Sequence, residues 1–314
     1  VVNELRRRGM PVLAVARDIT RIACDVPAIA ATITDPGSLD RAFAGCAVVI
    51  NCAGPFLDTA APIVEAALRA NASYLDVTAE QPSASWLFTN YDRRARDAGV
   101  AIIPAAGFYG GLADLLASVL VPDGRADEIT VAVALDHWWP TEGTRITGAR
   151  NKSERMMVKN GELTPITLPA EETDWDFGPP FNTQRMVELS FSEVVTIAHH
   201  IRVDRLRSFF SMAPLGELRS AATPGPTAVD ADGRSSQRFA LEVIARTGDL
   251  TRRALATGQD IYAISAPLVV EAAARMMAPP FISRGTLSLG QAFEPRDYLD
   301  SVTSRHFAIS TVGI

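Results

Sequence analysis

The chain has 314 residues, of which 47% are apolar and 21% are charged, and its mean hydropathy is +0.10. These values indicate a folded globular protein with one large core or two moderate ones, and they exclude an intrinsically disordered chain. The net charge of −6 and the isoelectric point near 5.3 provide no general attraction to phosphate backbones or anionic lipid, so nucleic-acid binding is not expected.

Three further features limit the class of protein. The basic run Arg6–Arg8 closes a short helical stretch, and we interpret it as a solvated helix end that complements the helix dipole. Cys24, Cys46 and Cys52 lack metal-like spacing and fit a reducing cytoplasm, with Cys52 read as a small buried hydrophobe. No signal peptide is recognisable, and the longest apolar stretch, 263–280, is too short and too amphipathic to span a membrane.

From the start to about residue 120, short apolar runs alternate with helix-like segments. The expected strands are 11–16, 30–32, 47–53, 73–78 and 100–107. The expected helices are 1–8, 35–45, 59–72 and 87–99. Strands that are apolar on both faces and are each followed by a helix indicate a parallel sheet covered on both sides. Right-handed crossovers then give a doubly wound sheet.

After about residue 128 the pattern changes, and we expect a second α+β domain with a mixed or antiparallel sheet. A long strand at 128–138 is followed by a polar segment, 144–163, with a helical stretch and an Asn-Gly turn. The segment 223–236 reads as a long hairpin-like connection. A long helix is expected from 260 to 278, with Pro267 in its first turn.

Small residues follow several of the predicted strands. NCAGPF at 51–56, DVTAE at 76–80 and PAAGF at 104–108 all lack bulky side chains at the turn. Ligands bind beyond the carboxyl ends of the strands in a doubly wound sheet, and Gly and Ala let the backbone approach a flat ligand or a phosphate. Tight turns also use glycine for local reasons, so that reading stays open. Together the turns favour a dinucleotide site.

The series PVLAVARD, VVINCAGPF, SYLDVTAE and PAAGF resembles the NADP-binding domain of the saccharopine dehydrogenase-like oxidoreductases. The second half, with WDFGPPF, EVVTIAHHI, GQDIYAISAPLVVEAA and GTLSLGQAFEPRDYLD, is similar to the single-chain bacterial members of that group, which also includes trans-acting enoyl reductases of lipid assembly. The resemblance implies a Rossmann-type domain over 1–125. It also implies a substrate or dimerisation domain over 126–314, whose final helices pack back on the first domain.

Members of this group open with a strand and a glycine-rich turn that holds the pyrophosphate. This sequence starts inside the helix that would follow. We therefore expect that the first strand and the glycine-rich loop are missing through truncation, and that a chain without them binds cofactor weakly or not at all.

The end of the second expected strand indicates which cofactor is used. Ala16 is followed by Arg17, whose guanidinium can pair with a 2′-phosphate, whereas NAD enzymes usually carry an acidic residue there. NADP is therefore favoured and NAD stays possible, as does a surface pair of Arg17 with Asp18. Asp35 resembles the group's residue near the adenine, or caps the following helix. The expected cofactor-binding residues are Arg17, Asp35, Cys52, Ala53, Gly54, Pro55, Phe56, Ala106, Gly107 and Phe108.

No pattern identifies the proton donor, so the catalytic residue stays unknown. The weak candidates are Glu80, Tyr109 and His137. Core packing is the alternative for His137, and Asp76 reads as a buried hydrogen-bonding carboxylate. On a strand, the adjacent His199 and His200 would point to opposite faces, so no metal site is expected.

The sequence therefore predicts an NADP-dependent oxidoreductase that transfers hydride to or from a small or lipid-like carbonyl, imine or enoyl substrate. A catalytically inactive dinucleotide-binding or scaffolding protein with the same fold is the alternative. The expected partner is a small-molecule substrate in the cytoplasm, and a homodimer stays open as the assembly.

Overall fold

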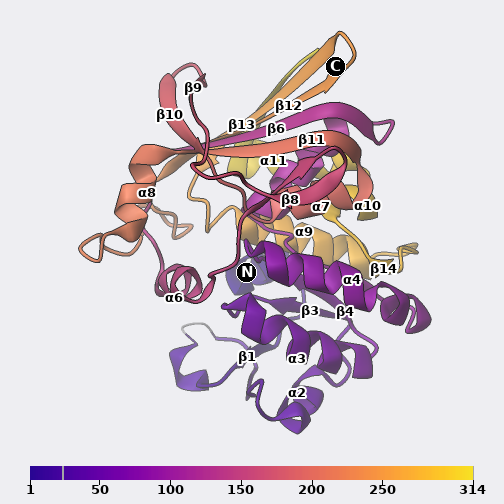
Figure 1. The fold of residues 1–314 in the computed structure, drawn as a ribbon. Helices are drawn as coiled ribbons and strands as arrows, with labels where there is room; N and C mark the ends of the chain where they lie inside the picture. The colour runs from indigo at the N-terminus through magenta and orange to yellow at the C-terminus, as the bar shows by residue number, and fades with distance from the viewer. Residues whose placement is uncertain (23–24, 314) are drawn as a thin grey trace.

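The computed structural model describes residues 1–22 and 25–313, so Cys24 lies outside the described residues. Short strands alternate with helices in the first part of the chain (Figure 1). Its elements are α1 (Val2–Arg7), β1 (Ala14–Ala16), the 3-10 helix η1 (Ile19–Arg21), β2 (Ala28–Ala30), α2 (Pro36–Phe43), β3 (Val48–Asn51), α3 (Phe56–Arg69), β4 (Ser73–Asp76), α4 (Gln81–Asp97), β5 (Ala101–Ile103), the π-helical turn η2 (Phe108–Leu112) and α5 (Ala113–Leu120).

Longer strands characterise the second part. Its elements are β6 (Arg125–Leu135), α6 (Glu142–Arg150), β7 (Met156–Lys159), β8 (Glu162–Pro165), β9 (Glu172–Asp176), β10 (Thr183–Glu188), α7 (Glu193–His200), β11 (Arg202–Ser211), α8 (Met212–Arg219), β12 (Arg238–Thr247), β13 (Leu250–Gln259), α9 (Ser265–Met277), β14 (Gly285–Thr286), α10 (Leu289–Ala292), α11 (Pro295–His306) and β15 (Phe307–Val312).

Two sheets are wholly parallel among the described residues. The first sheet has the order β14-β5-β4-β3, and a separate small sheet pairs β1 with β2. The predicted α/β architecture with parallel strands is therefore correct. The prediction of a buried strand over 11–16 is wrong, because β1 has three residues and Val15 is exposed. β1 pairs only with β2, so its apolar side chains are not enclosed as those of a central strand are.

The nine-stranded sheet, which we call the second sheet, is mixed, as predicted. Its order is β15-β13-β12-β6-β11-β10-β9, and β6 and β11 are the parallel pair on that path. β7 and β8 form a hairpin through Asn160 and Gly161, which both have positive φ and confirm the predicted turn. The segment 223–236 is not a hairpin connection, because it joins α8 to β12. β11 and β12 lie on opposite sides of β6, which separates them.

The last part of the chain returns to the first sheet. β14 extends that sheet in parallel beside β5, with Gly285 opposite Ala101. The helix α9 lies between the two sheets (Figure 1), and it begins five residues later than predicted. Asp260 has positive φ, and its carboxylate accepts from the N–H groups of Tyr262 and Ala263, so the chain turns before the helix starts. Pro267 lies in the first turn, as predicted.

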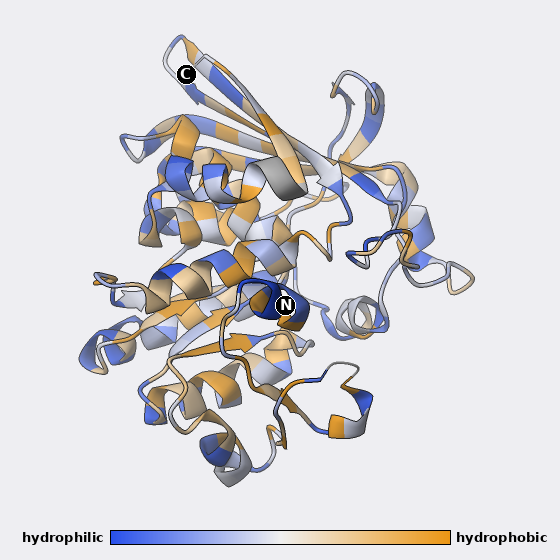
Figure 2. Cartoon of the chain, turned by 180° about the vertical axis from the view of Figure 1, so that it is seen from behind, coloured by the Kyte–Doolittle hydropathy of each residue, from blue (hydrophilic) through white to orange (hydrophobic). Residues whose placement is uncertain are grey.

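The helix α1 is strongly hydrophilic (Figure 2), but its basic run is only partly solvated. Arg6 is exposed, whereas Arg7 and Arg8 both bond to Glu4. Arg8 also pairs with Glu271 of α9, so the prediction of a solvated helix end is wrong for this residue. Among the described residues, no helix has the length and apolar character needed to cross a bilayer.

Candidate functional site

The buried side chain of Asn51 fixes the turn after β3 through hydrogen bonds. The Asn51 amide nitrogen donates to Tyr74 Oη at 3.1 Å, and its oxygen accepts from the Ala53 N–H at 2.9 Å. The backbone of the turn is therefore fixed, with Cys52, Ala53 and Gly54 exposed. The interpretation of Cys52 as a buried hydrophobe is wrong. β3 ends at Asn51, so Cys52 lies just beyond the strand and is exposed.

The backbone conformation of Gly54 does not require glycine, since its φ is not in the positive range. A Cβ atom built on it would lie 3.3 Å from the Thr147 hydroxyl of α6. The second half of the chain therefore approaches this turn closely. Arg150 of the same helix donates to Asp58 of α3 at 2.6 Å, which ties α6 to the first sheet's layer.

Glu80 bonds to the residues that follow the turn. Its buried carboxylate accepts from the N–H groups of Phe56 at 2.7 Å and Leu57 at 3.3 Å, the first residues of α3. Pro55 is partly buried and Phe56 is buried. Glu80 thus caps a helix, and a carboxylate placed there also complements the helix dipole.

The turn after β5 is buried, which corrects the expectation for three residues. Ala106, Gly107 and Phe108 lie under α9 and are shielded from solvent. The Phe108 N–H donates to Ser265 Oγ at 3.1 Å, and a Cβ atom on Gly107 would also come within 3.1 Å of that oxygen. The small size of Gly107 permits the close approach of α9, and all three residues are buried and expose no surface in this structure.

Asp76 links the ends of β4 and β5. Its carboxylate accepts from the N–H groups of Ala105 at 2.7 Å and Thr78 at 3.0 Å, and from the Tyr74 hydroxyl at 2.9 Å. Burial raises the pKa of Asp76 to about 6, although these hydrogen bonds act in the opposite direction. The prediction of a buried hydrogen-bonding carboxylate is confirmed.

Arg17 and Asp35 are both exposed at the edge formed by β1 and β2. Asp18 accepts from the Thr20 N–H at 3.0 Å, and no carboxylate in the described part of the chain pairs with Arg17. Asp35 precedes α2, but its carboxylate makes no capping bond and lies 3.8 Å from Arg41. Both side chains are therefore available to a ligand.

A second group of polar side chains lies where the two halves of the chain meet. Tyr109 follows β5, Arg155 precedes β7, and Glu193 begins α7. The Tyr109 hydroxyl and Glu193 Oε2 are buried without a partner among the described residues. The ring of Phe191 contacts both Tyr109, at 4.3 Å between centroids, and the Arg155 guanidinium, at 4.9 Å. We refer to Tyr109, Arg155, Phe191 and Glu193 as the interface cluster.

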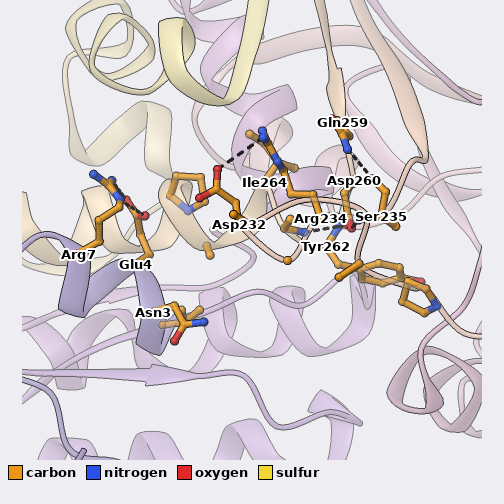
Figure 3. Close-up of a pocket in the computed structure, with 18 of the residues that line it drawn as sticks. Asn3, Glu4, Arg7, Asp232, Arg234, Ser235, Gln259, Asp260, Tyr262 and Ile264 are labelled. Atoms are coloured by element: carbon orange, nitrogen blue, oxygen red, sulfur yellow. Dashed lines mark hydrogen bonds and ion pairs between the residues drawn. The ribbon is translucent and has the colours of Figure 1, made fainter. Parts of the chain in front are cut away.

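A cavity of about 770 Å³ opens beside this region, between α1, the segment before β12 and the turn before α9 (Figure 3). Its volume is in the range of small-molecule sites. Tyr262 lines the cavity, and its hydroxyl bonds to Trp138 Nε1 at 2.9 Å and to the Thr144 hydroxyl at 3.0 Å.

The histidines lie apart from this region. His137 is exposed and bonds to Glu217 at 2.8 Å, and this contact raises the pKa of His137. The alternative that His137 packs in the core is therefore wrong, whereas the adjacent Trp138 is buried there. His199 and His200 end the helix α7 rather than a strand, and they contact Thr286 and Asp114 respectively. Within residues 1–22 and 25–313, no three His, Cys, Asp or Glu side chains form a metal-binding group.

Sequence reasoning missed Arg155, Glu193 and Tyr262. Each belongs to an unremarkable polar or amphipathic segment, and only the tertiary fold brings them near Tyr109. Arg155 follows Lys152 and Glu154 before a short apolar strand, a position where a solvated side chain is the ordinary expectation.

Known proteins resemble this chain mainly in the first part. Residues 14–103 match the family model described as the saccharopine dehydrogenase NADP-binding domain. A saccharopine dehydrogenase-like oxidoreductase of Bos taurus is 32% identical over 94 residues, which cover 30% of this chain and 22% of the relative. The trans-acting enoyl reductase of Mycobacterium ulcerans is 25% identical over 190 residues, covering 56% of this chain and 46% of the relative. The chain thus spans less than half the length of either relative.

A solved structure extends the resemblance to the whole fold. The apo saccharopine dehydrogenase (L-Glu forming) of Saccharomyces cerevisiae aligns with a TM-score of 0.68 at 12% identity, covering 99% of this chain and 96% of that one. At this identity the likeness shows the fold alone, and it confirms the predicted fold class. The NADP-binding family model agrees with the predicted cofactor. The resemblance to the saccharopine dehydrogenase-like oxidoreductases is therefore confirmed, by sequence in the NADP-binding region and by fold along the chain.

Proposed function

We propose that this protein is an NADP-dependent oxidoreductase that transfers hydride to or from a carbonyl, imine or enoyl group of a small or lipid-like substrate. One observation carries the proposal: the region that matches an NADP-binding domain contains an exposed turn after β3, and Thr147 from the second half of the chain approaches this turn closely. Residues 1–125 would bind the cofactor and 126–314 would form the substrate side.

Different exposed residues near the strand ends would bind different parts of the cofactor. Arg17 would hold the 2′-phosphate, and Asp35 would lie near the adenine. The exposed backbone of Cys52, Ala53 and Gly54 would lie along the dinucleotide, which the absence of bulky side chains permits. Bound NADPH supplies the hydride, and the chain must position the acceptor and provide a proton.

Tyr109 is the best of the three candidate proton donors. Glu80 is committed to capping α3, and His137 is exposed and bonded to Glu217. The Tyr109 hydroxyl has no partner among the described residues, and burial raises its pKa well above the ordinary value. It therefore stays protonated at neutral pH and can donate to a strongly basic product anion, such as an alkoxide.

The proposal includes a cytoplasmic location, because a reducing compartment keeps Cys46 and the exposed Cys52 as free thiols. Energy transfer from tryptophan to bound NADPH tests the binding step, since the chain has four tryptophans, and one of them, Trp138, bonds to Tyr262 of the cavity wall. In the full-length protein we expect a signal with NADPH that exceeds that with NADH, and oxidation of NADPH by at least one aldehyde, imine or enoyl substrate. No signal with NADPH would contradict the proposal, and binding without turnover would contradict its catalytic part.

A further inference from the structure

We propose that His200, Asp114 and Gly290 form a pH-sensitive clasp that holds the segment 285–292 against α5 and α7. Asp114 lies in the first turn of α5, and His200 is the last residue of α7. Gly290 belongs to α10, which follows β14 in the last part of the chain. The clasp therefore joins three elements that are distant in sequence. It goes beyond the proposed function, because it governs the order of a chain segment and not the reaction.

Asp114 is the centre of the clasp. Its carboxylate is completely buried, and each of its oxygens has a partner. Oδ1 lies 2.7 Å from His200 Nε2, and Oδ2 accepts from the Gly290 N–H at 2.7 Å. A Cβ atom on Gly290 would collide with the Ser118 hydroxyl of α5, so α10 comes this close only because the residue is glycine. The backbone of the segment thus contacts the buried carboxylate directly.

His200 supplies the positive charge that a buried carboxylate needs. It is the ion-pair partner of Asp114 among the described residues, and its side chain is 14% exposed. Burial acts to lower the pKa of His200, but the charge of Asp114 and the hydrogen bond to it outweigh burial, so the pKa is raised above the ordinary 6.5. His200 also ends α7, where the helix dipole favours a cation. The pair is therefore charged at mildly acidic pH.

The stability that the clasp provides is lost as the pH rises. A raised pKa means that the closed segment binds the proton of His200 more tightly than the open one. This stability is therefore complete below pH 6.5 and disappears above the raised pKa. The neutral imidazole then leaves Asp114 as a buried anion with only uncharged donors, which is costly. Opening of the segment, which would hydrate the carboxylate, becomes easier at mildly alkaline pH.

The other titratable groups that face the segment keep their charge over this range. His199 lies with its Nε2 3.2 Å from the Thr286 carbonyl, and burial lowers the pKa of His199, so it is mostly neutral above pH 6.5. Asp92 of α4 accepts from the Thr286 N–H at 3.0 Å, and its hydrogen bond with Arg96 lowers the pKa of Asp92, which stays ionised. Among the described residues, His200 is therefore the group beside the segment whose charge changes between neutral and mildly alkaline pH.

The segment itself is weakly anchored. β14 pairs with β5 through only two residues, Gly285 and Thr286. Leu289 is buried in the core, but the hydroxyl groups of Thr286 and Ser288 are buried without a partner among the described residues. An unsatisfied buried hydroxyl opposes the closed state. A segment with few backbone bonds and two such hydroxyls opens more easily than the core, so the charge of one histidine can decide its order.

Amide hydrogen exchange of the full-length protein without cofactor tests the clasp. After correction for intrinsic exchange, the protection of residues 285–292 should fall about threefold or more, relative to that of β6, between about pH 6 and about pH 9. His200→Gln keeps an N–H donor toward Asp114 but cannot take a charge, so its segment should be weakly protected at both pH values. His137→Gln is the matched control, because His137 is exposed and bonds to Glu217 elsewhere, and it should keep the wild-type pH dependence.

A second variant separates the charge of His200 from a purely structural role. In His200→Gln combined with Asp114→Asn, the two amides can bond to each other and no buried charge remains. At about pH 9 the segment should therefore be better protected than in His200→Gln alone. Unchanged wild-type protection between the two pH values, a pH dependence retained in His200→Gln, or a double variant no better protected than the single one would each overturn the inference. Because no NADPH is used, these outcomes are independent of the proposed function.

Discussion

Asp76 is a single residue on which three structural contacts depend, and its ionisation works against folding. Its pKa rises from the ordinary 3.8 to about 6 on burial, so the folded state binds the proton more tightly than the unfolded state. The stability gained from this proton is complete below the unfolded pKa, and it is lost as the pH rises through about 6.

Asp76→Asn should therefore be more harmful at low pH than at high pH. Asparagine stays neutral, so the wild type alone loses stability between about pH 4 and about pH 7. Urea unfolding at several pH values should show the stability deficit of the variant shrinking as the pH rises. Asp97→Asn, at an exposed position paired with Arg93, serves as the control and should show no such trend. A deficit that is constant or grows with pH would contradict the assignment.

Arg17 allows a direct test of cofactor choice. Arg17→Ala should weaken NADPH binding by about 1.5–3 kcal/mol, the range for a hydrogen bond to a charged group. NADH affinity should barely change, because NADH lacks the 2′-phosphate. Fluorescence titration with both cofactors measures the difference, and equal losses for the two would assign Arg17 a structural role.

Tyr109 should affect chemistry more than binding. Tyr109→Phe keeps the ring stacked on Phe191 and removes the hydroxyl, so we expect NADPH affinity to stay near that of the wild type. The turnover number should fall about 10²-fold or more, the usual contribution of a positioned acid. Glu80→Gln should instead lower stability through the cap on α3. Full turnover in Tyr109→Phe would rule out its role as proton donor.

At the scale of elements, the turn after β3 and the helix α6 act on one another. Gly54→Val would place its branched carbon beside the Thr147 hydroxyl, 3.3 Å from the position of Cβ, and across the exposed face of the turn. Since φ at Gly54 is not positive, the backbone should tolerate the change, and Tm without ligand should stay near the wild-type value. NADPH should no longer raise Tm. Early melting combined with a normal NADPH shift would show that the turn does not contact the cofactor.

The helix α1 has only six residues, too few for stability in isolation, so it depends on tertiary anchors. Glu271 of α9 pairs with Arg8, which also bonds to Glu4. Glu271→Gln should accelerate hydrogen exchange across α1 by about tenfold or more, while amides of β6 stay unchanged. Glu128→Gln removes an exposed pair with Arg246 and should leave α1 unaffected.

Helix positions were predictable from apolar periodicity, but two further starts besides that of α9 were not. α4 begins at Gln81, whereas the pattern predicts 87, because the segment 82–85 is polar or small and gains its burial from tertiary packing. α3 begins at Phe56, three residues before the predicted start, since Glu80 supplies the N-terminal cap from another loop. Both errors arise from contacts with residues distant in sequence.

At the scale of the whole molecule, the sequence predicted the layers better than the site. Alternating strands and helices indicated the parallel sheets, and the change of pattern near residue 128 indicated the mixed sheet. Arg17 and Asp35 could be proposed from the sequence because each follows an expected strand, and strand ends are recognisable from the local sequence. The interface cluster was not, because Arg155 and Glu193 reach Tyr109 only through the path of the second sheet.

The pairing of β14 with β5 has a consequence for how the protein is made. Gly285 and Thr286 extend a sheet whose other strands lie before residue 104, so the edge of β5 stays unpaired in a nascent chain until residue 285 has been made. Domains usually fold as units as they emerge, but this one waits for its last strand and for the helix α9 that covers its turns. Chaperone demand should therefore depend on translation speed between residues 104 and 285, and a ribosome stalled before Gly285 should carry an aggregation-prone chain.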